Sequence, residues 1–346
     1  MPEDKTGVLL LQLGTPDSPS TSDVRKYLSE FLTDWRVIDI PWLGRQILVK
    51  GIIAPIRAPK SAKLYRNIWT EKGSPLLIYG MEVKKKLQTS LGENYVVEFG
   101  MRYQNPPLKI ALENLKKAGV RKLIVFPLFP QFASSSTGSA LELLFREMAE
   151  WQFIPDIKVH SSYYDHPGFT TLWADKARQM NPDNYDKVMF TFHGVPWRHI
   201  RKSGCSVMSS CKGLTQETPH ECPAITDENY TCYRAQCFAS ARAVIEKLGL
   251  ENEKAIITFQ SRLGNDPWLT PYTDKTLIRL AGEGKKRILV FSMSFVADCL
   301  ETIYEVGKEY NDLFIEHGGE KVQLIPSLNS DEGWIKFIHQ SVTGEV

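Results

Sequence analysis

Hydrophobic residues are concentrated in eight short runs along the chain. Each run is almost continuously apolar and is bounded by glycine, proline or polar residues, which is typical of buried β-strands. The predicted strands cover residues 7–13, 95–99, 122–126, 157–160, 187–192, 255–259, 287–292 and 322–325. Strands without alternating polar positions are expected in parallel sheets that are covered on both faces.

Helical patterns separate most of these strands. The segments 108–119, 139–151 and 237–250 repeat apolar residues at helical spacing, and Gly119 is a typical helix stop. The alternation predicts an α/β protein with two doubly wound, Rossmann-like domains, each with a parallel four-stranded sheet, facing a central cleft. We expect an N-terminal domain over 1–160 and a C-terminal domain over 161–330, with a last helix near 331–346 that can pack back on the first domain.

The fifth predicted strand leads directly into His193 and Gly194, in "KVMFTFHGVPWRH". Ligands of doubly wound sheets bind beyond the carboxyl ends of the strands, so we expect His193 to reach the cleft. A single histidine at this place could equally be a hydrogen-bonded structural residue. The alternative is a base that takes up and releases a proton.

Three acids follow the seventh predicted strand. Asp298, Glu301 and Glu305 have the spacing of one face of an α-helix, within an acidic helix expected over 298–305. Acids in a first turn complement the helix dipole, but this explains Glu305 less well than the other two. With His193 expected at the same rim, the row predicts a base and a path for a metal ion or protons.

The loops after two other strands limit the choice of function. The first strand is followed by "LGTPDSPS", which lacks the glycine patterns that bind phosphates, so a nucleotide cofactor is not expected. The third strand leads into "PQFASSSTGS", where Ser136 or Ser139 could cap a helix. The same hydroxyls could instead face a ligand.

Composition and charge exclude other partners. The net charge is only +2, so a nucleic-acid partner is not expected. The first residues, "MPEDKTGV", place acids before a short apolar run, so we expect no signal peptide and a cytoplasmic protein. Residues 40–57 are amphipathic, which suits a helix packed on its own domain, the mouth of an apolar pocket or a membrane surface.

Cysteines form a local group. Five of the six cysteines lie within residues 205–237. In a cytoplasmic protein such a group indicates metal binding rather than disulfides.

The motifs together resemble those of the ferrochelatases over roughly residues 7–340. The stretches that carry the resemblance are "LLLQLGTP", "YRNIWTEKGSPL", "GMRYQNPP", "FPQFASSSTGS", "TFHGVP", "TFQSRLGNDPWLTPYTD" and "FVADCLETIYE". The resemblance implies a lyase that inserts Fe2+ into protoporphyrin IX, with release of two protons, in the last step of haem biosynthesis. Iron insertion into coproporphyrin, cobalt chelation, and a two-domain protein that binds haem or metal without catalysis remain as alternatives.

The resemblance also assigns residues. His193 would be the base near the pyrrole nitrogens and Glu301 the opposing carboxylate, with Asp298 and Glu305 as further candidate metal ligands. Arg57 and Ser74 would hold propionates. The residues expected to line the macrocycle are Leu13, Arg102, Tyr103, Ser134, Thr137 and Phe259. The segment 40–57 corresponds to the hydrophobic lip of the family, which implies contact with the inner face of a membrane.

An insertion over about 197–232 departs from the common family pattern. It contains Cys205, Cys211, Cys222 and Cys232, and four thiolates are the number required by a 2Fe–2S cluster. Some bacterial ferrochelatases carry such a cluster in an internal segment of this kind. The alternative is a set of reduced cysteines without a ligand.

Overall fold

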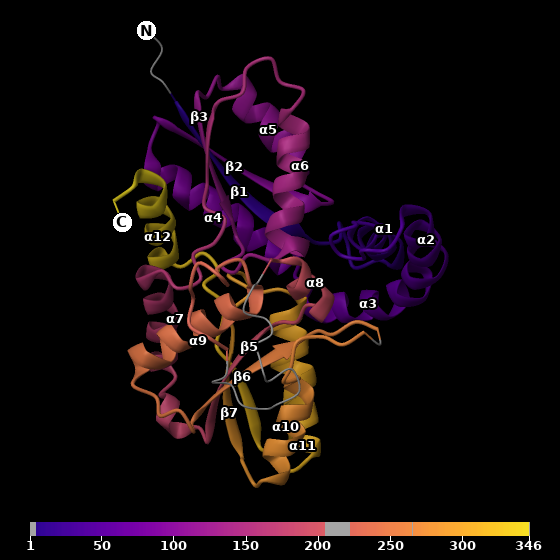
Figure 1. Ribbon diagram of the computed structural model, residues 1–346, viewed down its shortest axis with the longest axis vertical. Coiled ribbons are helices and arrows are strands. Elements are labelled where there is room, and N and C mark those ends of the chain that lie inside the picture. Colours follow the sequence, from indigo (N-terminus) through magenta and orange to yellow (C-terminus); the bar gives the residue numbers. More distant parts are fainter. Residues whose placement is uncertain (1–4, 205–221, 265, 346) are drawn as a thin grey trace. The chain divides into compact units, whose positions relative to one another are not determined.

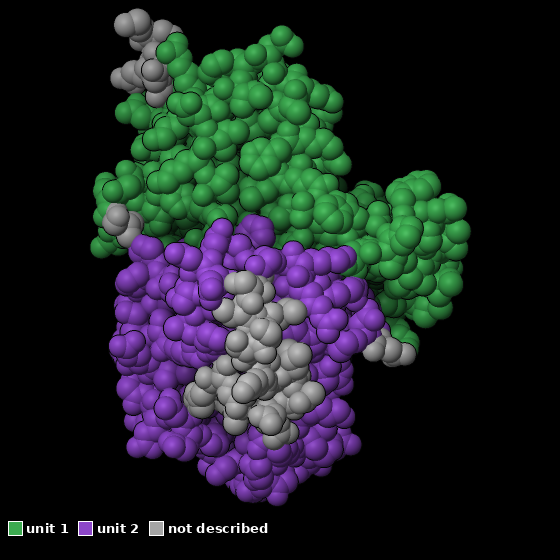
Figure 2. Space-filling view, in the orientation of Figure 1, with its two compact units in different colours: residues 1–129, 133–162, 329–346 green, residues 130–132, 163–328 purple. Residues whose placement is uncertain are grey.

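The computed structural model describes residues 5–204, 222–264 and 266–345, so Cys205 and Cys211 lie outside the described residues. The chain forms two compact units, coloured green and purple in Figure 2. Unit 1 comprises residues 1–129, 133–162 and 329–346, and unit 2 comprises residues 130–132 and 163–328.

Unit 1 is built on a parallel four-stranded sheet with the order β2-β1-β3-β4 (Figure 1). Its strands are β1 (Thr6–Gly14), β2 (Tyr95–Tyr103), β3 (Lys122–Pro127) and β4 (Asp156–Val159). Its helices are α1 (Thr21–Leu32), α2 (Trp42–Gln46), α3 (Ala54–Ile68), α4 (Pro75–Leu91), α5 (Leu108–Lys117), α6 (Ser139–Met148) and α12 (Glu332–Thr343), with π-helical segments η1 (Ile47–Ile53) and η2 (Ser134–Gly138).

Unit 2 contains a second parallel four-stranded sheet, with the order β6-β5-β7-β8. Its strands are β5 (Lys187–His193), β6 (Ala255–Gln260), β7 (Arg287–Ser292) and β8 (Lys321–Leu324). Its helices are α7 (Pro167–Gln179), α8 (Trp197–Lys202), α9 (Tyr233–Leu248), α10 (Thr273–Gly282) and α11 (Asn311–Glu316), with the 3-10 turn η3 (Pro182–Asn184) and the π-helix η5 (Leu300–Tyr310). The eight predicted strands and the α/β class are therefore confirmed.

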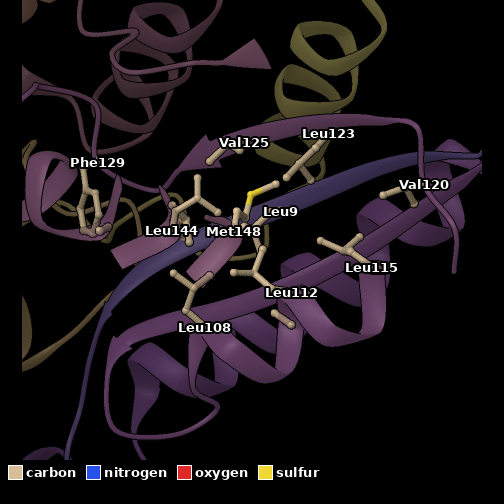
Figure 3. Packing of buried hydrophobic residues seen from close by; sticks show 13 residues of the cluster. Leu9, Leu108, Leu112, Leu115, Val120, Leu123, Val125, Phe129, Leu144 and Met148 are labelled. Carbon is tan, nitrogen blue, oxygen red and sulfur yellow. The ribbon is translucent and has the colours of Figure 1, made fainter. Parts of the chain in front are cut away.

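Apolar periodicity explains how the helices cover the sheets. In α5 the buried residues are Leu108, Ala111, Leu112 and Leu115, which form one helical face. Figure 3 shows this face packed against β1 and β3, with Leu144 and Met148 from α6 in the same cluster. Full burial of one such leucine contributes about 1.5–3 kcal/mol, so the stripe is sufficient to fix α5 on the sheet.

The last helix belongs to unit 1. α12 packs on α4, and its Trp334 and Phe337 rings stack with centroids 5.5 Å apart. Both rings also contact Phe126 of β3. The C-terminal residues thus help to cover a sheet whose strands all come from the first half of the chain.

Gly14, at the end of β1, is required by a close approach of two strands. Its φ is +132°, and a Cβ atom built there would lie 2.2 Å from the carbonyl oxygen of Tyr103 in β2. Gly119 also has a positive φ, +68°, but a Cβ there would meet nothing within 4 Å. A side chain at Gly119 would therefore meet only backbone strain, whereas one at Gly14 would also clash with β2.

Substitution Gly14→Ala should reduce the free energy of unfolding by about 4 kcal/mol or more, because β1 and β2 must move apart. Gly119→Ala, which adds only backbone strain, should cost about 1–2 kcal/mol. Chemical denaturation of both variants measures the difference. Equal losses of stability in the two variants would show that the close approach of Tyr103 is not the reason for a glycine at position 14.

Candidate functional site

His193 is the last residue of β5 and is held in one orientation. Its Nδ1 lies 2.7 Å from the carbonyl oxygen of Gly194. Because a carbonyl oxygen can only accept a hydrogen bond, this contact places the proton of the neutral ring on Nδ1. Nε2 then keeps its lone pair, which is the state of a base.

Gly194 allows the chain to turn directly behind this histidine. A Cβ atom on Gly194 would lie 3.0 Å from the carbonyl oxygen of Gln260 and 3.2 Å from the Trp268 ring. The Gly194 N–H donates to the same Gln260 oxygen over 2.8 Å. A side chain at this position would therefore crowd the end of β6 and the Trp268 ring.

The backbone of His193 is fixed by two side chains that sequence reasoning missed. Its N–H donates to Ser294 Oγ over 3.1 Å, and its carbonyl oxygen accepts from the hydroxyl of Tyr233 over 2.8 Å. Tyr233 and Ser294 are themselves 3.0 Å apart. Nothing in the spacing of these residues along the chain indicates that they meet.

The acidic segment is a π-helix, so the predicted α-helical face of three acids is wrong. A π-helix has i→i+5 hydrogen bonds and wider turns, and η5 begins only at Leu300. Asp298 precedes it, and its Oδ1 accepts from Thr302 Oγ1 over 3.0 Å and from the Ser327 N–H over 3.3 Å. Asp298 therefore supports the start of η5.

Glu305 lies within η5 and is surrounded by donors. Its Oε1 accepts from the Tyr310 hydroxyl over 2.7 Å, and its Oε2 accepts from Ser261 Oγ and from Gln260 Nε2. Burial raises the pKa of Glu305, and the nearby Glu301 carboxylate adds to this effect, which outweighs the opposing hydrogen bonds. Glu305 therefore holds a proton to a higher pH than an ordinary glutamate.

Gln260 joins the two parts of this site. It is the partner of His193 in the β5–β6 register, and its Nε2 lies 3.3 Å from the Glu301 carbonyl oxygen and 3.3 Å from Glu305 Oε2. The structure thus brings His193, Glu301 and Glu305 to one edge of the unit 2 sheet. Ser261, the next residue, has φ +66°, which is a strained backbone for a side chain of this kind.

No fixed metal centre is found in the part of the chain that the structure describes. In that part, no group of three or more His, Cys, Asp and Glu side chains is placed to hold a metal ion.

Unit 1 contains a second polar cluster, centred on Asp34, which sequence reasoning did not identify. Asp34 Oδ2 accepts from Arg102 Nη2 over 2.7 Å, from the Tyr103 hydroxyl over 2.9 Å and from Ser139 Oγ over 2.5 Å. Its Oδ1 accepts from the Arg36 N–H over 2.8 Å. Two residues predicted to line a macrocycle are therefore held by one buried carboxylate.

The charge of Asp34 is stabilised in spite of its burial. Burial alone would raise the pKa of this carboxyl, but the hydrogen bonds from Ser139 and Arg36 and the charge of Arg102 outweigh it. The pKa of Asp34 is consequently lowered from its ordinary value of 3.8.

The predicted capping role of Ser136 or Ser139 is wrong. The segment η2 precedes α6 without a break, Gly138 occupies the N-cap position of α6, and no side chain caps it. Ser139 Oγ instead accepts from Arg102 Nε over 2.7 Å.

The other residues of the hydroxyl loop differ from one another. Ser134 Oγ accepts from Arg36 Nη1 over 3.0 Å. Thr137 is fully buried, and its hydroxyl has no hydrogen-bond partner among the residues that the structure describes. An unpaired buried hydroxyl is costly, so Thr137 is the member of the loop with an unused bonding group.

The remaining macrocycle and propionate candidates occupy varied environments. Leu13 is half-buried near the end of β1, and Arg57 is exposed on α3. Ser74 is only 2% exposed and accepts a hydrogen bond from Thr15 Oγ1 over 2.9 Å. Its hydroxyl is therefore already engaged.

Phe259 is part of the aromatic core of unit 2. It is 2% exposed, and its ring contacts those of Phe192 and Phe238. The structure thus gives this candidate a packing role beneath the sheet edge.

Two of the four candidate cluster ligands are described. Cys222 and Cys232 are buried and are not joined in a disulfide. Burial raises the pKa of the Cys237 thiol well above its usual value, and Cys232 and Cys222 lie close enough to add to this effect. Cys237 therefore belongs to the same group of thiols.

The amphipathic segment exposes an unusual amount of apolar surface. The exposed fractions of Trp42, Leu43, Ile47, Ile52 and Ile56 are 66%, 63%, 62%, 51% and 63%. Residues 40–70 contain basic residues and no acidic ones. None of the helices in the described ranges is long and apolar enough to cross a membrane.

The chain is similar to known proteins over nearly its whole length. A family model described as "Ferrochelatase" matches residues 5–346. The chain belongs to the ferrochelatase family. A ferrochelatase of Legionella pneumophila (strain Paris) is 43% identical over 99% of this chain and 100% of its own length, and a ferrochelatase of Coxiella burnetii (strain Dugway 5J108-111) is 42% identical over 97% and 92%.

Solved structures show the same fold at low identity. The sirohydrochlorin chelatase SirB from Bacillus subtilis subspecies spizizenii, in complex with cobalt, matches with a TM-score of 0.55 and 10% identity over 99% of this chain and 94% of its own. SirB from Bacillus subtilis with Fe3+ matches with a TM-score of 0.52 and 10% identity over 98% and 94%. The two-sheet architecture of this ferrochelatase family member is therefore that of the chelatases.

The lowered pKa of Asp34 predicts a pH dependence of stability. A carboxyl whose pKa is lower in the folded protein stabilises the fold above its unfolded pKa, near 3.9, and loses this contribution as the pH falls through the folded pKa. Wild-type protein should therefore be more stable than Asp34→Asn at pH 7, and the difference should shrink below about pH 4. Thermal melts of both proteins from pH 7 to pH 3 measure it, and a difference that stays constant over this range would contradict the assignment.

Proposed function

We propose that this protein inserts ferrous iron into protoporphyrin IX and releases two protons, which makes protohaem in the last step of haem biosynthesis. The proposal is supported by the family match over nearly the whole chain and by one geometric observation. That observation is a histidine whose Nε2 keeps its lone pair, at the same sheet edge as Glu301 and Glu305.

The chemistry requires the removal of two pyrrole N–H protons and the delivery of one Fe2+ ion, so charge is conserved. We propose that His193 Nε2 accepts a pyrrole proton, because it is the ring nitrogen that the Gly194 contact leaves without a proton. Glu301 is the opposing carboxylate, and Glu305 behind it can accept and release protons because burial raises its pKa. Carboxylate oxygens also suit the replacement of water ligands on the incoming ion.

Unit 1 supplies the proposed contacts to the pigment. The main candidates are Arg102, Tyr103 and Thr137. Two further candidates from the family motifs are Leu13 and Ser134. Thr137 has the strongest support because its buried hydroxyl has no partner among the described residues. Arginine can form two parallel hydrogen bonds with a carboxylate. Arg57, which is exposed, is therefore suited to bind a propionate.

Substitution His193→Ala should reduce iron insertion by at least about 100-fold, which is the usual contribution of a positioned base. Glu301→Gln should also reduce turnover strongly. Both variants should still bind protoporphyrin, as measured by fluorescence quenching. His317→Ala, which changes an exposed histidine of the same unit, is the matched control and should retain normal turnover.

An anaerobic absorption assay with Fe2+ and Zn2+ provides the measurement. Near-normal turnover in His193→Ala would remove the proposed base. Preferred turnover of coproporphyrin, or of a corrinoid precursor with cobalt, would redirect the proposal to another tetrapyrrole. Tight binding without any metalloporphyrin product would indicate a binding protein.

We also propose that the cysteine-rich insertion holds a 2Fe–2S cluster with Cys205, Cys211, Cys222 and Cys232 as ligands. Thiolates are the usual ligands of such clusters, and the two described candidates, Cys222 and Cys232, are buried and not in a disulfide. When present, the cluster would crosslink the insertion through its four cysteines and would add a redox-active group.

Protein purified without oxygen should then be brown and contain iron and labile sulfide in nearly equal amounts. Cys222→Ser and Cys232→Ser should lose both, whereas Cys299→Ser should keep them. Colourless, sulfide-free wild-type protein would exclude the cluster.

We propose, finally, that the protein is cytoplasmic and contacts the inner face of the membrane through residues 40–57. The exposed apolar side chains and the absence of acids over 40–70 suit an anionic lipid surface.

The triple variant Trp42→Ser/Leu43→Ser/Ile47→Ser should lose at least about tenfold in affinity for vesicles that contain anionic lipid, because each buried apolar side chain contributes on the order of 1 kcal/mol or more. The control Phe153→Ser/Ile154→Ser removes exposed apolar residues elsewhere in unit 1 and should bind normally. Co-sedimentation with vesicles measures both, and an equal loss in the two proteins would contradict the assignment to 40–57.

A further inference from the structure

We propose that Asp34 is a positioning residue for porphyrin binding, which orients Arg102 and Tyr103 and joins them to the base of the segment 40–57. The inference rests on the proposed function, because it takes Arg102 and Tyr103 as contacts of the pigment. No motif in the sequence indicates this role for Asp34.

Several hydrogen-bond donors converge on one oxygen of Asp34. The Asp34 side chain is 3% exposed, and its Oδ2 is the shared acceptor for donors from β2 and from α6. A carboxylate can accept several hydrogen bonds at once, whereas an amide in its place would turn one acceptor into a donor. The arrangement therefore requires the charged form of this side chain.

The Arg102 side chain is held by more than one partner. Its Nη2 donates to Asp34 and its Nε donates to Ser139, so the planar guanidinium is fixed at two points. The guanidinium carbon also lies 4.6 Å from the centroid of the Tyr103 ring. Two fixed points on a rigid plane determine the direction of the remaining N–H groups of the guanidinium. Asp34 therefore affects binding of a ligand to Arg102 by orienting these N–H groups.

Hydrogen bonds also connect Asp34 to the residues that precede the segment 40–57. Asp34 Oδ1 accepts from the Arg36 N–H, and the Arg36 side chain pairs with Glu142 of α6 over 2.5 Å. Glu142 also accepts from the indole N–H of Trp35 over 3.2 Å. The chain that leads from α1 into 40–57 is thus tied to α6 immediately after Asp34.

The same connection continues into the segment itself. The guanidinium of Arg45, in α2, donates to the carbonyl oxygens of Ile38 and Ile40 over 3.2 and 2.8 Å. Arg45 is buried, although Leu43 and Ile47 on either side of it are exposed. The Ile38 N–H in turn donates to the Asp34 carbonyl oxygen over 3.0 Å, so hydrogen bonds connect α2 to Asp34.

A double-mutant cycle tests the proposal with protoporphyrin IX as the probe, measured by fluorescence quenching and by KM and kcat. Asp34→Asn should raise Kd and KM for the porphyrin about tenfold and leave kcat within about twofold, because orientation and not chemistry is lost. In the Arg102→Gln background, Asp34→Asn should cause little further loss, because its effect passes through Arg102.

The control separates positioning from simple destabilisation. Glu98 lies on the same strand as Arg102, and its partly buried carboxylate pairs with Lys84 over 2.7 Å. Glu98→Gln removes this charge. It should lower the thermal midpoint without a change in porphyrin affinity. Equal rises in Kd for Asp34→Asn and Glu98→Gln, or additive losses for Asp34→Asn and Arg102→Gln, would overturn the proposal.

Two further variants keep the test valid if Asp34→Asn does not fold. Ser139→Ala and Tyr103→Phe each remove one donor to Asp34 and retain the carboxylate. Ser139→Ala should raise the porphyrin Kd about threefold, because Arg102 keeps one of its two fixed points, and an unchanged Kd would contradict the proposal. Since binding is measured without turnover, these results can be interpreted even if His193→Ala leaves activity intact.

Discussion

The carboxyl ends of parallel strands lie at the same edge of a sheet, and the candidate chemistry of this protein depends on that constraint. β5 ends at His193, β6 ends at Gln260, and the chain after β7 forms η5. The register pairs His193 with Gln260, and the Gln260 amide reaches Glu301 and Glu305. His193 therefore lies at the same sheet edge as Glu301 and Glu305, although more than a hundred residues separate them in the sequence.

Two buried carboxylates illustrate how surroundings decide the charge of a side chain. Asp34 has donors on both oxygens and a guanidinium beside it, so its pKa is lowered. Glu305 also accepts several hydrogen bonds, but it is buried beside another carboxylate, so its pKa is raised. A carboxyl with a lowered pKa suits the support of an arginine, and a carboxyl with a raised pKa suits proton transfer.

The structure adds physical detail at residues that the resemblance assigns. The motif "TFHGVP" identifies His193, and the structure adds the Nδ1 contact that leaves Nε2 as the basic nitrogen. The motif "GMRYQNPP" identifies Arg102 and Tyr103, and the structure adds Asp34 as their common partner. For Ser74 the structure adds a hydrogen bond from Thr15, and for Phe259 it adds a ring contact with Phe192.

Hydrophobic patterning along the chain was sufficient to predict the eight strands and the two parallel sheets, because continuous apolar runs have few other ways to be buried. It also placed His193 at a strand end, since that position follows from the strand alone. The π-helical form of 300–310, the position of Asp298 outside it, and the meeting of Asp34 with Ser139 could not be read from spacing. These features depend on hydrogen bonds between side chains that are distant in the sequence, and only the packed tertiary structure decides which donors reach which acceptors.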